Sequence, residues 1–131
     1  MQHYRIIQWV LRITAALIML QTLFYKFSGS PESVYIFSTL GIEPWGRIGT
    51  GIAELIAGAL LLMNRTYVFG ALMGIGIMAG AVLSHVFVLG IAVMGDGGWL
   101  FTLALITMAA CTALCLLNIP TTLKLIKLKF R

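Results

Sequence analysis

Four stretches of the chain are almost entirely apolar, and short polar segments separate them. A helix needs roughly 20 apolar residues to cross a bilayer at 1.5 Å per residue. The predicted spans are Ile6–Phe27, Ile48–Met63, Tyr67–Met94 and Trp99–Asn118. The second span is short and the third is long, so we expect tilting or local thinning of the bilayer. The pattern predicts an all-α fold, an integral membrane four-helix bundle that forms one membrane domain over residues 1–131.

The first connection between spans is long enough to contain a helix of its own, over about residues 31–40. Ser30 offers a capping hydroxyl, Pro31 suits the first helical position, and Gly41 is a typical helix stop. Val34 and Phe37 fall on one side of this helix. We therefore expect a short amphipathic helix at the membrane interface, in the first outer loop.

Composition and charge support a membrane protein. The chain is 60% hydrophobic and 10% charged, and its net charge is +5. Most basic residues lie in the amino-terminal segment, the second turn and the carboxyl tail: Arg5, Arg65, Lys124, Lys127, Lys129 and Arg131. That distribution sets membrane orientation and excludes a nucleic-acid partner, and the positive-inside rule predicts cytoplasmic N and C termini. We expect a bacterial-type inner (plasma) membrane, with the tail either on its anionic inner surface or acting as a snorkelling stop-transfer anchor, which is favoured.

Glu54 is the most informative polar residue, because it lies within a span and a carboxyl group in hydrocarbon costs several kcal/mol unless paired or neutralised. It follows Arg47 by seven residues, a depth of roughly 10 Å from the outer start of its span. Lys26 ends the first span, Asp96 follows the third, and His85 lies roughly 27 Å from the inner start of the third. All five residues are therefore expected at similar depth.

Two interpretations of this set stay open. In the first, Glu54 and His85 face an outward or lateral pocket and contact a ligand, with the aromatic residues Tyr25, Trp45 and Trp99 around it. In the second, Lys26 or Arg47 neutralises Glu54, His85 donates to a carbonyl or to Asp96, and the network locks the helices together.

Arg12 supplies a charge near the inner end of the first span. It shares a helix face with Lys26, so it either faces the bundle or snorkels to the headgroups.

Other classes of site are poorly supported. One histidine within the spans and no i, i+4 ligand pair argue against a metal site. Cys111 and Cys115 are four residues apart, which favours two packed thiols over a dithiol redox site. No motif for a bound redox centre is present, so we do not expect this chain to catalyse a reaction alone.

The chain resembles the DoxX-like family of small four-span membrane proteins over nearly its whole length. The most specific match is Ala-Glu-Leu-Ile-Ala-Gly-Ala-Leu-Leu-Leu-Met-Asn-Arg, which ends at Arg65. Arg12, Lys26 with the following Ser-Gly, and His85 also match. The resemblance implies a membrane partner of a quinone-linked redox enzyme, with quinone as a cofactor candidate. The chain departs from the family at residues 22–24 and at Trp99, so the lip of a pocket is expected to be more aromatic.

Three functional hypotheses follow. The leading one is a protein that binds a hydrophobic molecule with a polar head, a quinone or a lipid, as the membrane subunit of a redox or envelope process. The second is an assembly scaffold for a partner membrane protein, and the third is a proton-coupled transporter, which is disfavoured by the lack of predicted broken helices. The compatible partners are membrane lipids, the hydrophobic molecule, a redox protein and a second copy of the chain.

Overall fold

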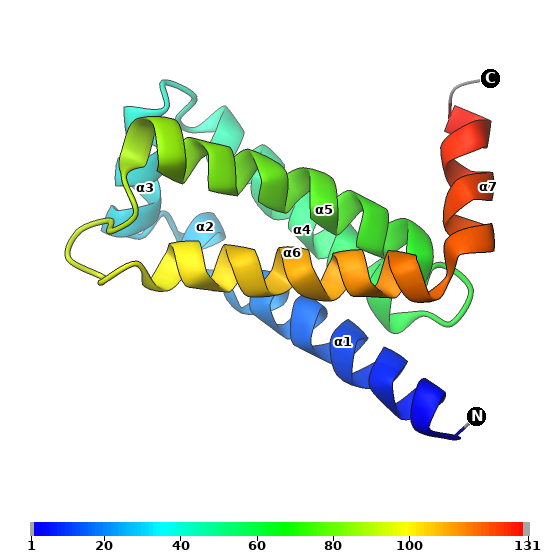
Figure 1. Cartoon of the computed structure of the whole chain (residues 1–131). Coiled ribbons are helices and arrows are strands. Elements are labelled where there is room, and N and C mark those ends of the chain that lie inside the picture. The colour runs from blue at the N-terminus through cyan, green and yellow to red at the C-terminus, as the bar shows by residue number, and fades with distance from the viewer. Residues whose placement is uncertain (1, 130–131) are drawn as a thin grey trace.

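A computed structural model describes residues 2–129, and these residues form helices joined by turns, with no β-strand among them (Figure 1). The all-helical prediction is confirmed. Helices satisfy every backbone hydrogen bond within the segment, as a lipid environment requires. The elements are α1 (Gln2–Gln21), α2 (Leu23–Ser28), α3 (Pro31–Thr39), α4 (Trp45–Leu62), α5 (Tyr67–Ser84), the π-helical turn η1 (His85–Leu89), α6 (Trp99–Leu117) and α7 (Ile119–Lys129).

Four helical segments are long and apolar enough to cross a membrane, in agreement with the predicted number of spans. They are α1 with α2 (Gln2–Ser28), α4 (Trp45–Leu62), α5 with η1 (Tyr67–Leu89) and α6 (Trp99–Leu117). Helices α4 and α6 each pack against both α1 and α5. The start of α1 and the end of α6 lie at the same end of the bundle, and α3 lies at the other (Figure 1). Which side is cytoplasmic stays a prediction.

The bundle buries small side chains and exposes large apolar ones. Ala15, Ala57 and Ala71 are fully buried in the core, whereas Leu17 and Phe87 are 62% and 77% exposed. A water-soluble protein of this size would rarely expose so much contiguous apolar surface. The exposed side chains are therefore suited to contact with lipid.

The glycine spacings of the second and third spans predict close helix approach, and some of these glycines do allow it. A Cβ at Gly74 would lie 2.6 Å from Cys111 Sγ, and one at Gly70 would lie 2.9 Å from the Leu61 backbone nitrogen. Gly76 has no atom of another element within 4 Å of a built Cβ, and the same is true of Gly49 and Gly80. For these three residues the packing interpretation was wrong.

The third span is shorter than predicted and ends at Leu89, not at Met94. Gly90 has φ 82°, and its N–H donates to the His85 carbonyl at 2.8 Å, which closes η1. The apolar residues after Gly90 extended the hydropathy pattern beyond the helix. Val93 is only 1% exposed because the loop folds it inward.

The predicted helix in the first connection is confirmed as α3, within one residue at its end. Ser30 Oγ accepts a hydrogen bond from the Ser33 N–H at 3.3 Å, and Pro31 occupies the first turn. After the helix, Gly41 has φ 77° and its N–H donates to the Ser38 carbonyl, a common helix stop. The placement of α3 at the membrane interface stays a prediction.

The carboxyl tail forms α7, which crosses the end of the bundle at a steep angle to the spans (Figure 1). Residues 130 and 131 of the predicted basic tail lie outside the described residues. Because α7 runs across the spans, its direction suits a helix along a membrane surface, and contact with anionic lipid there stays a prediction.

Candidate functional site

A cavity of about 710 Å³ lies at the α3 end of the bundle. Residues from α1 through α6 and from η1 line it, and Phe37 of α3 and Met78 of α5 are among its buried apolar members. Its volume falls within the range of small-molecule sites, roughly 300–1,000 Å³. Four side chains with a carboxyl or ammonium group and one imidazole line it: Lys26, Glu32, Glu54, Asp96 and His85. The cavity therefore combines apolar walls with a small number of polar groups.

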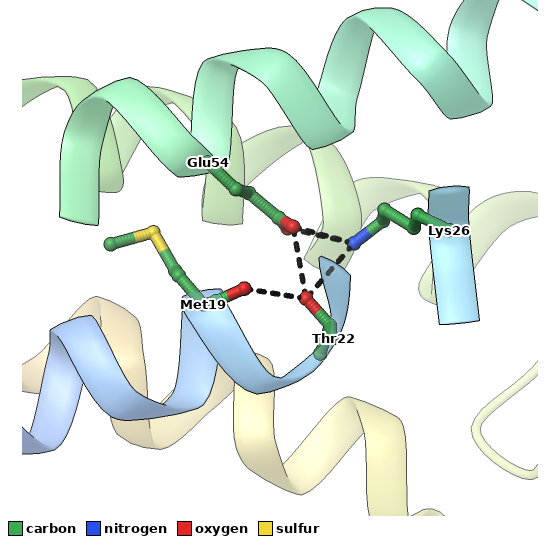
Figure 2. Close-up of polar contacts among 4 residues, drawn as sticks. All are labelled: Met19, Thr22, Lys26 and Glu54. Atoms are coloured by element: carbon green, nitrogen blue, oxygen red, sulfur yellow. Dashed lines mark hydrogen bonds and ion pairs between the residues drawn. The ribbon is translucent and has the colours of Figure 1, made fainter. Parts of the chain in front are cut away.

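Glu54 and Lys26 form a buried ion pair at the wall of this cavity. Lys26 Nζ lies 2.9 Å from Glu54 Oε1 and 2.7 Å from Oε2, and the two side chains are 14% and 4% exposed (Figure 2). Lys26 comes from α2 and Glu54 from α4, so the pair joins two spans. Mutual neutralisation makes burial of both charges tolerable.

Thr22 completes this network at the residue between α1 and α2. Its Oγ1 lies 2.9 Å from Glu54 Oε2, 2.8 Å from the Met19 carbonyl and 3.4 Å from Lys26 Nζ (Figure 2). Since the ammonium can only donate, Thr22 accepts from Lys26 and donates its one hydrogen to Glu54 or to Met19. α1 ends at Gln21 and α2 begins at Leu23, but Thr22 between them keeps right-handed helical angles (φ −74°, ψ −16°), so the two helices form one span.

His85 lies at the start of η1 and is 5% exposed. Its Nδ1 is 3.0 Å from the Gly90 carbonyl, and its ring meets Phe101 edge-on at 5.6 Å between centroids. A π-turn inside a helix is rare and is frequent at functional sites. The turn places His85 on the cavity lining while the contact with Gly90 fixes the ring.

Asp96 lies in the loop outside the spans and caps the start of α6. Its Oδ1 accepts from the N–H groups of Val93 at 3.0 Å and Gly98 at 2.8 Å, and its Oδ2 accepts from Leu100 at 3.2 Å. Desolvation raises the pKa of this carboxyl, but the backbone hydrogen bonds outweigh it and the pKa is lowered overall. Asp96 thus orders the loop that closes one edge of the cavity.

Arg47 lies near the site but does not pair with Glu54. Its Nε donates to Glu43 Oε1 at 2.9 Å, and its Nη1 donates to the Lys26 carbonyl. Of the predicted aromatic residues, Tyr25 and Trp99 line the cavity, whereas Trp45 does not and is 81% exposed. Arg47 therefore supports the backbone that carries Lys26, one step from the cavity.

Arg12 faces the bundle at the opposite end and does not snorkel. It is 2% exposed, and it donates from Nε to the Leu61 carbonyl at 2.6 Å and from Nη1 to Asn64 Oδ1 at 3.1 Å. Its guanidinium lies 3.7 Å from the Trp9 ring centroid and 4.5 Å from that of Tyr67. These contacts tie α1 to the turn between α4 and α5.

Sequence reasoning missed two parts of this arrangement. The first is Thr22, which precedes Lys26 by four residues and so lies on the same helix face. This spacing could have identified Thr22 from the sequence. At the opposite end, Asn118 Oδ1 accepts from Tyr67 Oη at 2.9 Å and from Gln8 Nε2 at 3.3 Å. No spacing rule connects residues so far apart in the chain. Within residues 2–129 no three His, Cys, Asp or Glu side chains are grouped as metal ligands.

The fold and site define a small multi-span α-helical membrane protein with a polar network beside a cavity. The sequence pattern of the DoxX family matches residues 7–89, from α1 to the end of η1. The chain belongs to the DoxX family and is an integral multi-pass membrane protein. The match includes Arg12, Thr22, Lys26, Glu54 and His85, whereas Asp96 and Trp99 lie beyond it. No curated protein and no solved structure gave a match.

Proposed function

We propose that this protein binds a hydrophobic small molecule with a polar head, such as a quinone or a lipid, in the cavity at the α3 end. The observation that carries this proposal is the Lys26–Glu54 pair, buried at the wall of a cavity of about 710 Å³. A buried pair contributes little net stability compared with apolar packing of the same volume. Its position beside a cavity of ligand size supports a role in binding.

In this proposal Glu54 contacts the polar head and exchanges protons with it. Lys26 stabilises the charged form of Glu54, and His85 is the second polar contact. Tyr25 and Trp99, which line the cavity and are 52% and 62% exposed, lie beside the ligand at its outer edge. Arg47 and Asp96 act on the site through the backbone segments that they hold.

The proposed context is a redox or envelope process of a bacterial-type inner membrane, with both termini cytoplasmic. The chain would serve as an accessory membrane subunit of a quinone-linked oxidoreductase, and a partner redox protein would bring the electron carrier. A second copy of the chain is a further proposed partner. The family membership supports this context, and the apolar cavity walls support a hydrophobic ligand.

The scaffold function is the second candidate, and one observation favours it. Both oxygens of Glu54 are hydrogen-bonded within the protein, and the network joins α1, α2 and α4. A closed network of this kind can fix helix geometry without any ligand. The proton-coupled transporter ranks third, and the junction of α1 and α2 at Thr22 is the feature that supports it. Proton flux into vesicles that is lost in Glu54→Gln would establish transport.

The test of binding must leave the ion pair intact, because Glu54→Gln also strands the Lys26 charge. Gly76 and Gly80 line the cavity, and a Cβ at either would meet no other element within 4 Å. Gly76→Leu should therefore project into the cavity and reduce its volume, while Lys26 and Glu54 themselves stay unchanged. Ala59→Leu is the matched control, since Ala59 is exposed on α4 and does not line the cavity.

The measurement is native mass spectrometry with lipid extraction of the wild type and both variants, with thermal stability recorded for each. We expect a hydrophobic molecule on the wild type and on Ala59→Leu, and its loss from Gly76→Leu at equal stability. If none of the three proteins retains a molecule, or if Gly76→Leu retains it fully, the cavity is not the binding site and the scaffold function leads.

A further inference from the structure

The tautomer of His85 follows from its contact with Gly90. A carbonyl oxygen can only accept, so the Nδ1 atom 3.0 Å from the Gly90 oxygen must carry a hydrogen. In the neutral imidazole the other nitrogen, Nε2, is then a bare acceptor. The π-turn, which ends at Gly90, thus determines what His85 offers to the cavity.

Nε2 of His85 is unpartnered and reachable. Among residues 2–129 no protein group forms a hydrogen bond with Nε2, although His85 is only 5% exposed. Among the same residues, Arg12 Nη2 is the one side-chain nitrogen or oxygen that is fully buried and has no hydrogen-bond partner, so Nε2 of His85 is not fully buried. The cavity that His85 lines is the accessible space that we assign to this acceptor.

The charged groups of the lining are already satisfied or repel anions. Lys26 directs its ammonium at both Glu54 oxygens and at Thr22, and the Asp96 oxygens accept from three backbone N–H groups. The lining contains three carboxylates, of Glu32, Glu54 and Asp96, and one ammonium, of Lys26. A ligand with a phosphate or carboxylate head would meet net negative charge.

We propose that the ligand of this cavity has a neutral head with a hydroxyl group, an alcohol or a phenol, that donates a hydrogen bond to His85 Nε2. This inference rests on the proposed function and narrows its ligand class. A head that has only carbonyl oxygens would leave Nε2 unpaired and desolvated, which is costly. A hydroquinone satisfies the requirement, whereas the corresponding quinone does not.

Two probes that differ only in the donor test this proposal: 4-nonylphenol and its methyl ether, 4-nonylanisole. Binding to detergent-solubilised protein is measured against protein-free micelles. The wild type should prefer the phenol by about threefold to tenfold, the value of one net hydrogen bond. His85→Asn is the variant, because its side-chain amide can still donate to Gly90 and has no atom at the position of Nε2. In this variant the preference for the phenol over the ether should fall to the value measured in protein-free micelles.

The outcomes separate the two proposals. Equal binding of both probes to the wild type, or an unchanged preference in His85→Asn, overturns the donor inference and leaves the binding function standing. No binding of either probe overturns the donor inference, and the mass spectrometry of Gly76→Leu then decides the binding function.

A second measurement does not depend on how the variant folds. The chain has two histidines, so imidazole ¹⁵N spectra of the wild type and His3→Gln assign His85. A bare Nε2 whose resonance shifts on addition of the phenol, and not of the ether, supports the proposal. A protonated Nε2 in the neutral ring contradicts it.

Discussion

The hydroxyl of Thr22 lies 2.9 Å from Oε2 of Glu54, at the residue that separates α1 from α2. The same hydroxyl lies 2.8 Å from the Met19 carbonyl. When Glu54 is ionised, Thr22 can donate a hydrogen bond to it. When Glu54 is neutral, Thr22 can accept a hydrogen bond from its O–H and donate to the Met19 carbonyl instead. One side chain thus satisfies both protonation states of the buried carboxyl group.

Thr22→Val should lower stability by about 1–3 kcal/mol, because it removes a buried hydrogen bond to a charged group while it keeps the side-chain shape. Thr22→Ser keeps the hydroxyl and should retain most of the stability. Thermal unfolding in one detergent compares the three proteins. A loss in Thr22→Ser with none in Thr22→Val would show that the methyl group, not the hydroxyl, matters.

Removal of one partner of the Lys26–Glu54 pair should cost more than removal of both. Lys26→Met or Glu54→Gln alone leaves an unpaired buried group, with a cost of about 3–5 kcal/mol. The double variant should recover a large part of that loss. A double-mutant cycle of unfolding free energies measures the coupling, and strictly additive losses would contradict a direct interaction.

The glycines of α5 should differ in their response to alanine. At Gly70 a Cβ would lie 2.9 Å from the Leu61 backbone nitrogen, so Gly70→Ala should destabilise the bundle by about 1–3 kcal/mol. At Gly76 the space is open, and Gly76→Ala should be neutral or stabilising by up to about 1 kcal/mol through helix propensity. Thermal unfolding of both variants decides this, and a similar loss at both positions would argue against close packing at Gly70.

Asp96 should make the loop before α6 sensitive to acid. Its pKa is lowered in the folded protein, so its contribution is fully present above the ordinary value of 3.8 and is lost as the pH falls through the lower folded pKa. Asp96→Asn should therefore be less stable than the wild type at neutral pH, and the difference should shrink below pH 3.8. Hydrogen exchange of the first turn of α6 measures it. A constant difference at all pH values would exclude a charge effect.

Arg12→Lys should destabilise the end of the bundle opposite the cavity. A lysine keeps the charge but cannot stack between the Trp9 and Tyr67 rings and reach Leu61 and Asn64 together. We expect a loss of about 2 kcal/mol from the desolvated cation–π contact. Unfolding with a matched Arg5→Lys control tests this, since Arg5 is exposed. Equal effects at the two positions would contradict the structural role of Arg12.

The number of spans could be predicted because it follows from hydropathy, and helical rise indicated which polar residues lie toward the same end of the bundle. Lys26, Glu54 and His85 accordingly line one cavity. The partner of Glu54 could not be predicted, because Lys26 and Arg47 lie at similar depth and helix rotation decides between them. The early end of the third span at Gly90 could not be predicted, because hydropathy carries no information on backbone angles. The link between Tyr67 and Asn118 depends on tertiary packing alone.

The buried apolar layer between Arg12 and the cavity has an electrical consequence. Along α1, Ala15 and Ala16 separate Arg12 from Met19, which lines the cavity, and these alanines are 0% and 1% exposed. Leu61 and Leu114, both 0% exposed, continue this layer on the neighbouring helices. A closely packed apolar layer has a low dielectric constant, so we expect a large part of a transmembrane voltage to fall across it. Lys26 and Glu54 line the cavity beyond this layer, and we expect them to experience a smaller part of that voltage.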